Sequence, residues 1–148
     1  MTGAAPLERT LAAIAEAAPD GAEDWWIIGS TAMHLSGYTD VAPDDVDIFA
    51  SRETAMGFLR YWKVEPAVPK THPQFRSDPF TSIYLPGCLR IELMGNLEVK
   101  HGEAWKSLRL VTREKVHGVY IPSSEEQVAI FRLFGREKDL DKAARLVG

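Results

Sequence analysis

The sequence has almost no cysteine and no long apolar run. A single cysteine, Cys88, occurs in 148 residues, so no internal disulfide can form. No apolar stretch approaches the ~18 residues that suggest a membrane span. The N-terminal residues also lack a basic region followed by an apolar stretch and a small-residue cleavage site. We therefore expect a cytoplasmic protein that makes no membrane contact.

Positive charge and paired histidines are scarce as well. The chain has 17 Lys and Arg against 21 Asp and Glu, a formal net charge of −4, which argues against a broad nucleic-acid surface. Its 4 histidines contain no pair at i, i+4, so a zinc site is not indicated. Neither internal repeats nor a linker rich in Gly or Ser divide the chain, and we expect one domain over residues 1–148.

What is present is a mixture of helical and strand patterns within one chain. Apolar periodicity, caps and turn residues predict helices over residues 6–18, 31–36, 52–62, 124–134 and 136–146. Short β-prone runs predict strands over residues 25–28, 45–49, 80–84, 88–94 and 116–121. The proline-rich stretch 63–79 is expected to be an irregular loop. The predicted class is α/β or α+β, with a mixed sheet flanked by helices.

Three acidic residues carry the main chemical signal. Asp45 and Asp47 are two residues apart in a predicted strand, so their carboxylates point to the same face and repel each other. A divalent cation removes that repulsion and is bound by oxygen ligands. Glu92 lies on the polar side of a second alternating strand and would supply a third carboxylate, as in two-metal sites. The alternative is that all three side chains simply face solvent.

A strand-to-helix turn offers a second signal. Gly29 and Ser30 lie where the strand 25–28 meets the next helix, and such a junction presents backbone N–H groups and a hydroxyl to a phosphate. Glycine allows a ligand to approach the backbone closely. The same residue types also occur in turns of purely structural origin.

Together these motifs resemble the signature of the polymerase-β-like nucleotidyltransferase superfamily, and the C-terminal residues resemble the small bacterial AbiEii-type nucleotidyltransferases. The similarity covers about residues 24–147. The segments that carry it are Ile28-Gly29-Ser30-Thr31-Ala32, Asp45-Val46-Asp47-Ile48, Ile91-Glu92-Leu93, Ile121-Pro122-Ser123, residues 125–133 and Arg136-Glu137-Lys138-Asp139-Leu140.

The resemblance implies a nucleotidyltransferase fold and assigns roles to particular residues. Mg²⁺ or Mn²⁺ would be held by the catalytic residues Asp45, Asp47 and Glu92. The donor NTP would meet Gly29 and Ser30 through its triphosphate. Arg136 and Lys138 would reach the phosphates or the acceptor, and the alternative for this pair is a solvated helix face.

Two functions from different classes follow. The first is a metal-dependent enzyme that moves an NMP from an NTP to a hydroxyl of RNA, protein or a small molecule. It would serve as a toxin or in phage defence, with a cognate antitoxin or a second copy as partner. The second is an inactive protein of the same fold that binds NTP or a partner, and a scaffold without any ligand is a third case.

Overall fold

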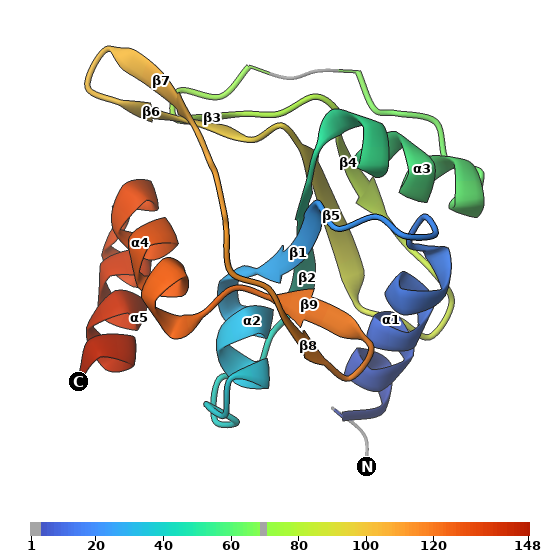
Figure 1. Cartoon of the computed structure of the whole chain (residues 1–148), viewed down its shortest axis with the longest axis horizontal. Coiled ribbons are helices and arrows are strands. Elements are labelled where there is room, and N and C mark those ends of the chain that lie inside the picture. Colours follow the sequence, from blue (N-terminus) through green and yellow to red (C-terminus); the bar gives the residue numbers. More distant parts are fainter. Residues whose placement is uncertain (1–3, 69–70) are drawn as a thin grey trace.

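The computed structural model describes residues 4–68 and 71–148. Helices and strands alternate along most of the chain, and β-strands are concentrated between residues 75 and 121 (Figure 1). The helices are α1 (Ala4–Ala17), α2 (Gly29–Leu35), α3 (Arg52–Trp62), α4 (Ser124–Phe134) and α5 (Glu137–Val147). Within the described ranges, no helix is both long enough and apolar enough to cross a bilayer.

A four-stranded mixed sheet lies at the centre, with the order β1-β2-β5-β4. The pairing of β2 with β5 is parallel, and the two outer pairings are antiparallel. A three-stranded sheet, β3-β6-β7, and a hairpin, β8-β9, flank it. The strands are β1 (Trp25–Ile28), β2 (Asp45–Ala50), β3 (Phe75–Arg76), β4 (Phe80–Ile83), β5 (Arg90–Gly95), β6 (Glu98–His101), β7 (Ala104–Ser107), β8 (Glu114–Val116) and β9 (Val119–Ile121).

Both faces of the central sheet are covered, and each face has its own core. Alternation along β1 sends Trp25 and Ile27 to one face, where they pack with side chains of α1 and α3. Trp26 and Ile28 point to the other face and pack with residues of β2, β6 and α4. Figure 1 shows α1 and α3 on one side of the sheet and the pair α4–α5 on the other. This second face also carries the acidic residues.

Most of the predicted elements are confirmed, including the helix caps. Ser51 accepts a hydrogen bond from the backbone N–H of Thr54, and Ser123 accepts one from Glu126, as expected of N-cap residues. Glu126 does not return the bond to Ser123, because its carboxylate accepts from the backbone N–H groups of Val111 and Thr112. It thereby ties the start of α4 to the preceding segment.

The predicted strand 116–121 is confirmed only for residues 119–121 (β9), because residues 117 and 118 form the turn of a hairpin. His117 and Gly118 have φ values of 51° and 83°, so the chain reverses between β8 and β9. The predicted loop 63–79 contains the short strand β3, and the sequence reading missed β6 and β7 entirely. Residues 69 and 70 of that loop lie outside the described residues.

Candidate active site

The three predicted acids lie on one face of two adjacent strands. In the parallel pairing of β2 with β5, Asp45 is opposite Arg90 and Asp47 is opposite Glu92. Residues in register on neighbouring strands share a face, as do residues two apart on one strand. The sheet therefore brings together Asp45, Asp47, Glu92 and the basic side chain of Arg90.

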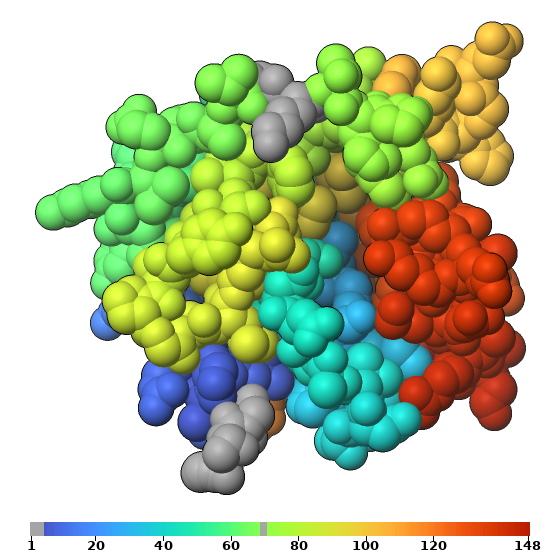
Figure 2. Space-filling view, turned by 180° about the vertical axis from the view of Figure 1, so that it is seen from behind, coloured from blue at the N-terminus to red at the C-terminus, as the bar shows by residue number. Residues whose placement is uncertain are grey.

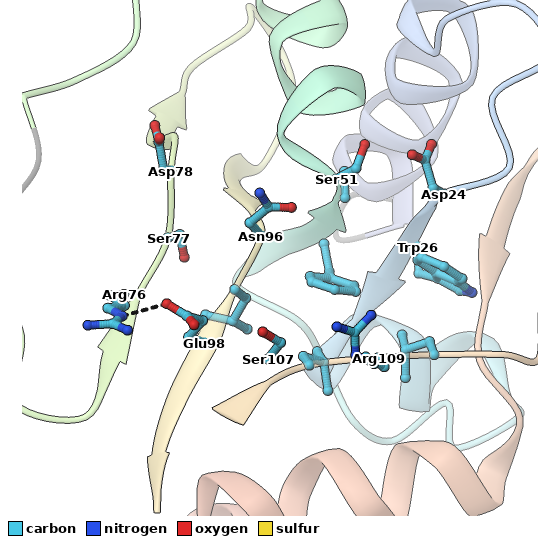
Figure 3. Close-up of a pocket in the computed structure, with 15 residues that line it drawn as sticks. Asp24, Trp26, Ser51, Arg76, Ser77, Asp78, Asn96, Glu98, Ser107 and Arg109 are labelled. Atoms are coloured by element: carbon cyan, nitrogen blue, oxygen red, sulfur yellow. Dashed lines mark hydrogen bonds and ion pairs between the residues drawn. The ribbon is translucent and has the colours of Figure 1, made fainter. Parts of the chain in front are cut away.

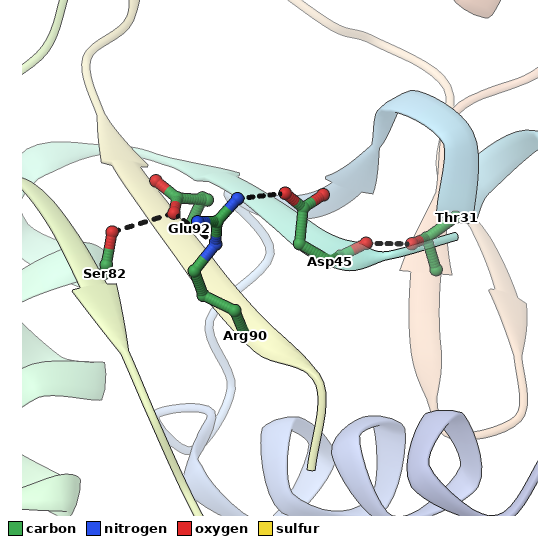
Figure 4. Close-up of polar contacts among 5 residues, drawn as sticks. All are labelled: Thr31, Asp45, Ser82, Arg90 and Glu92. Carbon is green, nitrogen blue, oxygen red and sulfur yellow. Dashed lines mark hydrogen bonds and ion pairs between the residues drawn. The ribbon is translucent and has the colours of Figure 1, made fainter. Parts of the chain in front are cut away.

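Arg90 joins two of these carboxylates (Figure 4). Its Nη2 donates to Oδ2 of Asp45 at 2.7 Å, and its Nε lies 2.9 Å from Oε1 of Glu92. The same oxygen of Glu92 accepts a hydrogen bond of 2.7 Å from the hydroxyl of Ser82 on β4. Glu92 is thus held from two sides, and its side chain is 14% exposed.

Asp47 has a different environment from the other two acids. Burial raises the pKa of its carboxyl to about 7, with a further contribution from the negative charges of Asp45 and Glu92. The positive charges of Arg90 and Arg136 act in the opposite direction and are too weak to restore the ordinary value. Asp47 is therefore a carboxyl group whose ionised form lacks sufficient positive charge nearby.

Gly29 lies directly against this carboxyl group. Its φ is +74°, and a Cβ at this position would lie 3.0 Å from Oδ2 of Asp47. Ser30 follows in the first turn of α2 and is half-buried. The hydroxyl of Thr31 donates to the backbone carbonyl of Asp45 at 2.9 Å, which joins α2 to the start of β2. The predicted phosphate turn and the predicted acids are therefore neighbours.

The two predicted basic residues differ in position. Arg136 is at the N-cap of α5, where its guanidinium pairs with the buried carboxylate of Asp139 at 2.6 Å and lies over the rings of Phe75 and Phe134. Its charge acts on Asp47 from across the site. Lys138 is exposed on the first turn of α5 and makes no hydrogen bond or ion pair with other described residues.

The donor chemistry of this face fits a divalent cation, whereas the present side-chain positions do not close around one. Three carboxylates offer the hard oxygen ligands that Mg²⁺ and Mn²⁺ accept, and the raised pKa of Asp47 reflects insufficient positive charge. Among residues 4–68 and 71–148, however, no three His, Cys, Asp or Glu side chains are arranged to hold one ion. The guanidinium of Arg90 lies between Asp45 and Glu92 (Figure 4).

The site also contains residues that sequence reasoning did not assign to it. Arg90 alternates with Glu92 on the predicted strand, so the period of two was the available signal. Ser82 and Thr31 had no such signal, because their contacts join segments that are distant in the sequence. Figure 2 views the molecule from behind, with the light-blue residues of α2 and the cyan residues that follow it between yellow-green residues and the red C-terminal helices.

A separate cavity of about 660 Å³ lies further along the same sheet (Figure 3). Its lining includes Trp26 and Phe49 but none of the predicted site residues. Two of its charged side chains, Arg76 and Glu98, are paired with each other at 2.5 Å. The carboxylates on β2 and β5 are the stronger candidate site, because the pKa of Asp47 is raised there to about 7. In the cavity lining, burial raises the pKa of Asp24, but hydrogen bonds from Ser51 and Thr54 bring it below its ordinary value.

Comparisons with known proteins agree with this geometry at the level of the fold. No family model matches the sequence, and no curated protein matches it. The structure is similar to the crystal structure of a "putative nucleotidyltransferase" from Thermotoga maritima, with a TM-score of 0.70 and 18% sequence identity. The match covers 94% of this chain and 91% of that chain. The chain therefore has the nucleotidyltransferase fold, a mixed sheet flanked by helices.

Proposed function

We propose that this protein is a metal-dependent nucleotidyltransferase that moves an NMP from an NTP to an acceptor hydroxyl. The observation that carries the proposal is the placement of Asp45, Asp47 and Glu92 on one face of β2 and β5 in a chain with this fold. Gly29 lies against Asp47 and Ser30 follows it in the chain, as a site for a triphosphate beside a metal requires.

In this proposal each residue of the site has a chemical task. Asp45, Asp47 and Glu92 would hold Mg²⁺ or Mn²⁺, which supplies charge neutralisation of the triphosphate and lowers the pKa of the acceptor hydroxyl. Backbone N–H groups at Gly29 and Ser30 would orient the phosphates, and Arg136 and Lys138 would add positive charge from α5.

The group transfer itself needs a base and a leaving group. The acceptor oxygen forms a bond to the α-phosphorus, and the bond from that phosphorus to the oxygen of the β-phosphate breaks in line, which releases pyrophosphate. The proton of the acceptor passes to the carboxylate of Glu92, which Ser82 and Arg90 hold in position. An RNA end, a protein hydroxyl and a small molecule all satisfy this chemistry.

The biological setting is also part of the proposal. The similarity of residues 121–140 to AbiEii-type proteins supports a role as a toxin or in phage defence, with a cognate antitoxin or a second copy as partner. The competing function is an NTP-binding or partner protein of the same fold without turnover. The contact of Arg90 with two of the three carboxylates favours this second candidate.

Thermal stability in the presence of nucleotides tests whether the protein binds an NTP together with a metal ion. Each of the four NTPs would be added with and without Mg²⁺ or Mn²⁺ to the wild type, to Asp47→Asn and to Asp44→Asn. A ligand at about 100 times its Kd stabilises the folded state by roughly 2.7 kcal/mol. We expect a metal-dependent rise in Tm with at least one NTP, absent in Asp47→Asn. Asp44 is exposed and next to the site, so Asp44→Asn should behave as the wild type.

Transfer of a labelled NMP then tests turnover. The nucleotide identified above would be supplied with label on its α-phosphate, together with RNA, protein extract and small hydroxyl compounds. Label on an acceptor, lost in Asp47→Asn, is the result expected of the enzyme. Metal-dependent NTP binding without transfer would support the inactive NTP-binding protein. No binding of any NTP would contradict the enzyme and leave only a protein that binds a partner.

A further inference from the structure

We propose that Arg90 is an internal cation that competes with a divalent metal ion for the carboxylates of Asp45 and Glu92. The inference rests on the proposed function, since it concerns the metal of that site. In addition to the three acids, it assigns to Arg90 the control of the affinity of the site for the metal ion.

The guanidinium of Arg90 lies between two of the three acids. It contacts Asp45 at 2.7 Å and Glu92 at 2.9 Å, and so bridges two strands at the point where the three acids meet. Both contacts join opposite charges, and the contact with Asp45 is also a hydrogen bond. A guanidinium presents several donors in one plane for such contacts. The oxygens of Asp45 and Glu92 that contact Arg90 are the ligands that a metal ion would otherwise bind.

Charge explains why the two cations exclude each other. The guanidinium keeps its proton under all ordinary conditions, so its positive charge cannot be removed by titration. A divalent ion bound to Asp45 would lie within a few ångströms of that charge and be repelled by it. Metal binding therefore requires that Arg90 move away from Asp45.

The structure leaves Arg90 free to make that movement. Its side chain is 47% exposed, whereas that of Glu92 is 14% exposed. Arg90 and Glu92 are two residues apart on β5, whereas Asp45 belongs to the neighbouring strand. A change of the Arg90 side-chain rotamer would release Asp45 and move Nε relative to Glu92, because Nε and both Nη atoms lie in one rigid plane. Arg90 is thus a positioning residue for Glu92 and a competitor at Asp45.

Binding of Mn²⁺, followed by electron paramagnetic resonance, tests the inference directly. The variants are Arg90→Gln, which removes the charge, and Arg90→Lys, which keeps it. Arg52→Gln is the matched control, because Arg52 also forms an exposed ion pair with an aspartate, Asp78, at 3.0 Å. We expect Arg90→Gln to bind Mn²⁺ about tenfold more tightly or better, as removal of one nearby positive charge permits. Arg90→Lys should stay closer to the wild type, and Arg52→Gln should match it.

A measurement on the unmodified protein removes any dependence on how the variants fold. The Arg90 Nε–H signal would be followed by NMR as Mg²⁺ is added. We expect this signal to shift with the same midpoint as metal binding, since the guanidinium rearranges when the ion enters. An unchanged signal at saturating Mg²⁺ would overturn the inference.

The outcomes also separate this inference from the proposed function. Tighter Mn²⁺ binding by Arg90→Gln supports the competition, including the case in which only the variant binds the ion. If the wild type binds Mn²⁺ and Arg90→Gln binds it equally or less tightly, the inference alone fails. If neither protein binds Mn²⁺, the metal-dependent function fails together with it.

Discussion

At the scale of single residues, the ionised carboxylate of Asp47 is in an electrostatically unfavourable environment. Its carboxyl group is desolvated and faces two other acids, and the result is a pKa of about 7 in place of 3.8. Perturbed acids of this kind are enriched at sites of chemistry, because a charge that is unfavourable for folding can be favourable for binding a cation. This environment also makes the stability of the protein depend on pH.

The sign of that dependence can be worked out. The pKa of Asp47 is higher in the folded state than in the unfolded chain, so the folded state binds the proton more tightly. The contribution of Asp47 to the free energy of unfolding therefore falls as pH rises from about 4 through about 7. Asp47→Asn removes the penalty and should stabilise the metal-free protein by roughly 1–3 kcal/mol at about pH 8. Near pH 4 the variant and the wild type should be almost equally stable.

Urea denaturation in the presence of a chelator, repeated across this pH range, measures the effect. Asp44→Asn is the control, because Asp44 is exposed beside the same strand. A difference between Asp47→Asn and the wild type that stays constant with pH would mean that the charge of Asp47 is not the cause.

At the scale of elements, the junction between β1 and α2 positions the carboxyl group of Asp47. The chain turns from strand into helix at Gly29 with a φ of +74°, a conformation that residues with a Cβ rarely adopt. The absence of a side chain also leaves room for the Asp47 carboxylate, which would be 3.0 Å from a Cβ at position 29. One glycine thus serves both the turn and the site.

Substitution by alanine can separate these two roles. Gly21 has the same φ of +74° but no atom within 4 Å of its Cβ position, so Gly21→Ala reports the cost of the backbone alone. That cost should be about 1–2 kcal/mol of unfolding free energy. Gly29→Ala should cost more, because Asp47 must also move, and should weaken binding of metal and NTP. Equal losses of stability in the two variants would show that the close approach to Asp47 has no energetic consequence.

At the scale of the whole molecule, the C-terminal helices complete the environment of the sheet face. Arg136 is held by Asp139, Phe75 and Phe134, so its charge is positioned by contacts within α5 and with β3 and α4. From there its positive charge partly offsets the rise in the pKa of Asp47 on β2. Residues more than 80 positions apart in the sequence therefore act on one carboxyl group.

This long-range effect is measurable without any ligand. Arg136→Gln removes the positive charge and should raise the pKa of Asp47 further above its ordinary value, as followed by a ¹³C NMR titration of the carboxyl carbon. Arg132→Gln, at an exposed position on α4, should leave that titration unchanged. An unaltered Asp47 titration in Arg136→Gln would indicate that α5 does not face the site as described.

The features that the sequence determined by itself are local ones. Alternation with a period of two places Asp45 and Asp47 on one face of β2, and serine caps define the starts of α3 and α4. Short polar strands such as β6 and β7 have no strong apolar pattern of their own, so they were not predicted. The turn at His117 and Gly118 was missed, although the glycine between Val116 and Val119 was the available signal.

Only the tertiary structure decided how these local pieces meet. The register that sets Asp45 opposite Arg90 and Asp47 opposite Glu92 joins strands 45 residues apart, and no local pattern specifies such a pairing. The contact of Arg90 with two acids, the desolvation of Asp47 and the reach of Arg136 all follow from that register and from the packing of α5. The sequence determined which side chains could form a charged site, and long-range packing decided which charges face one another.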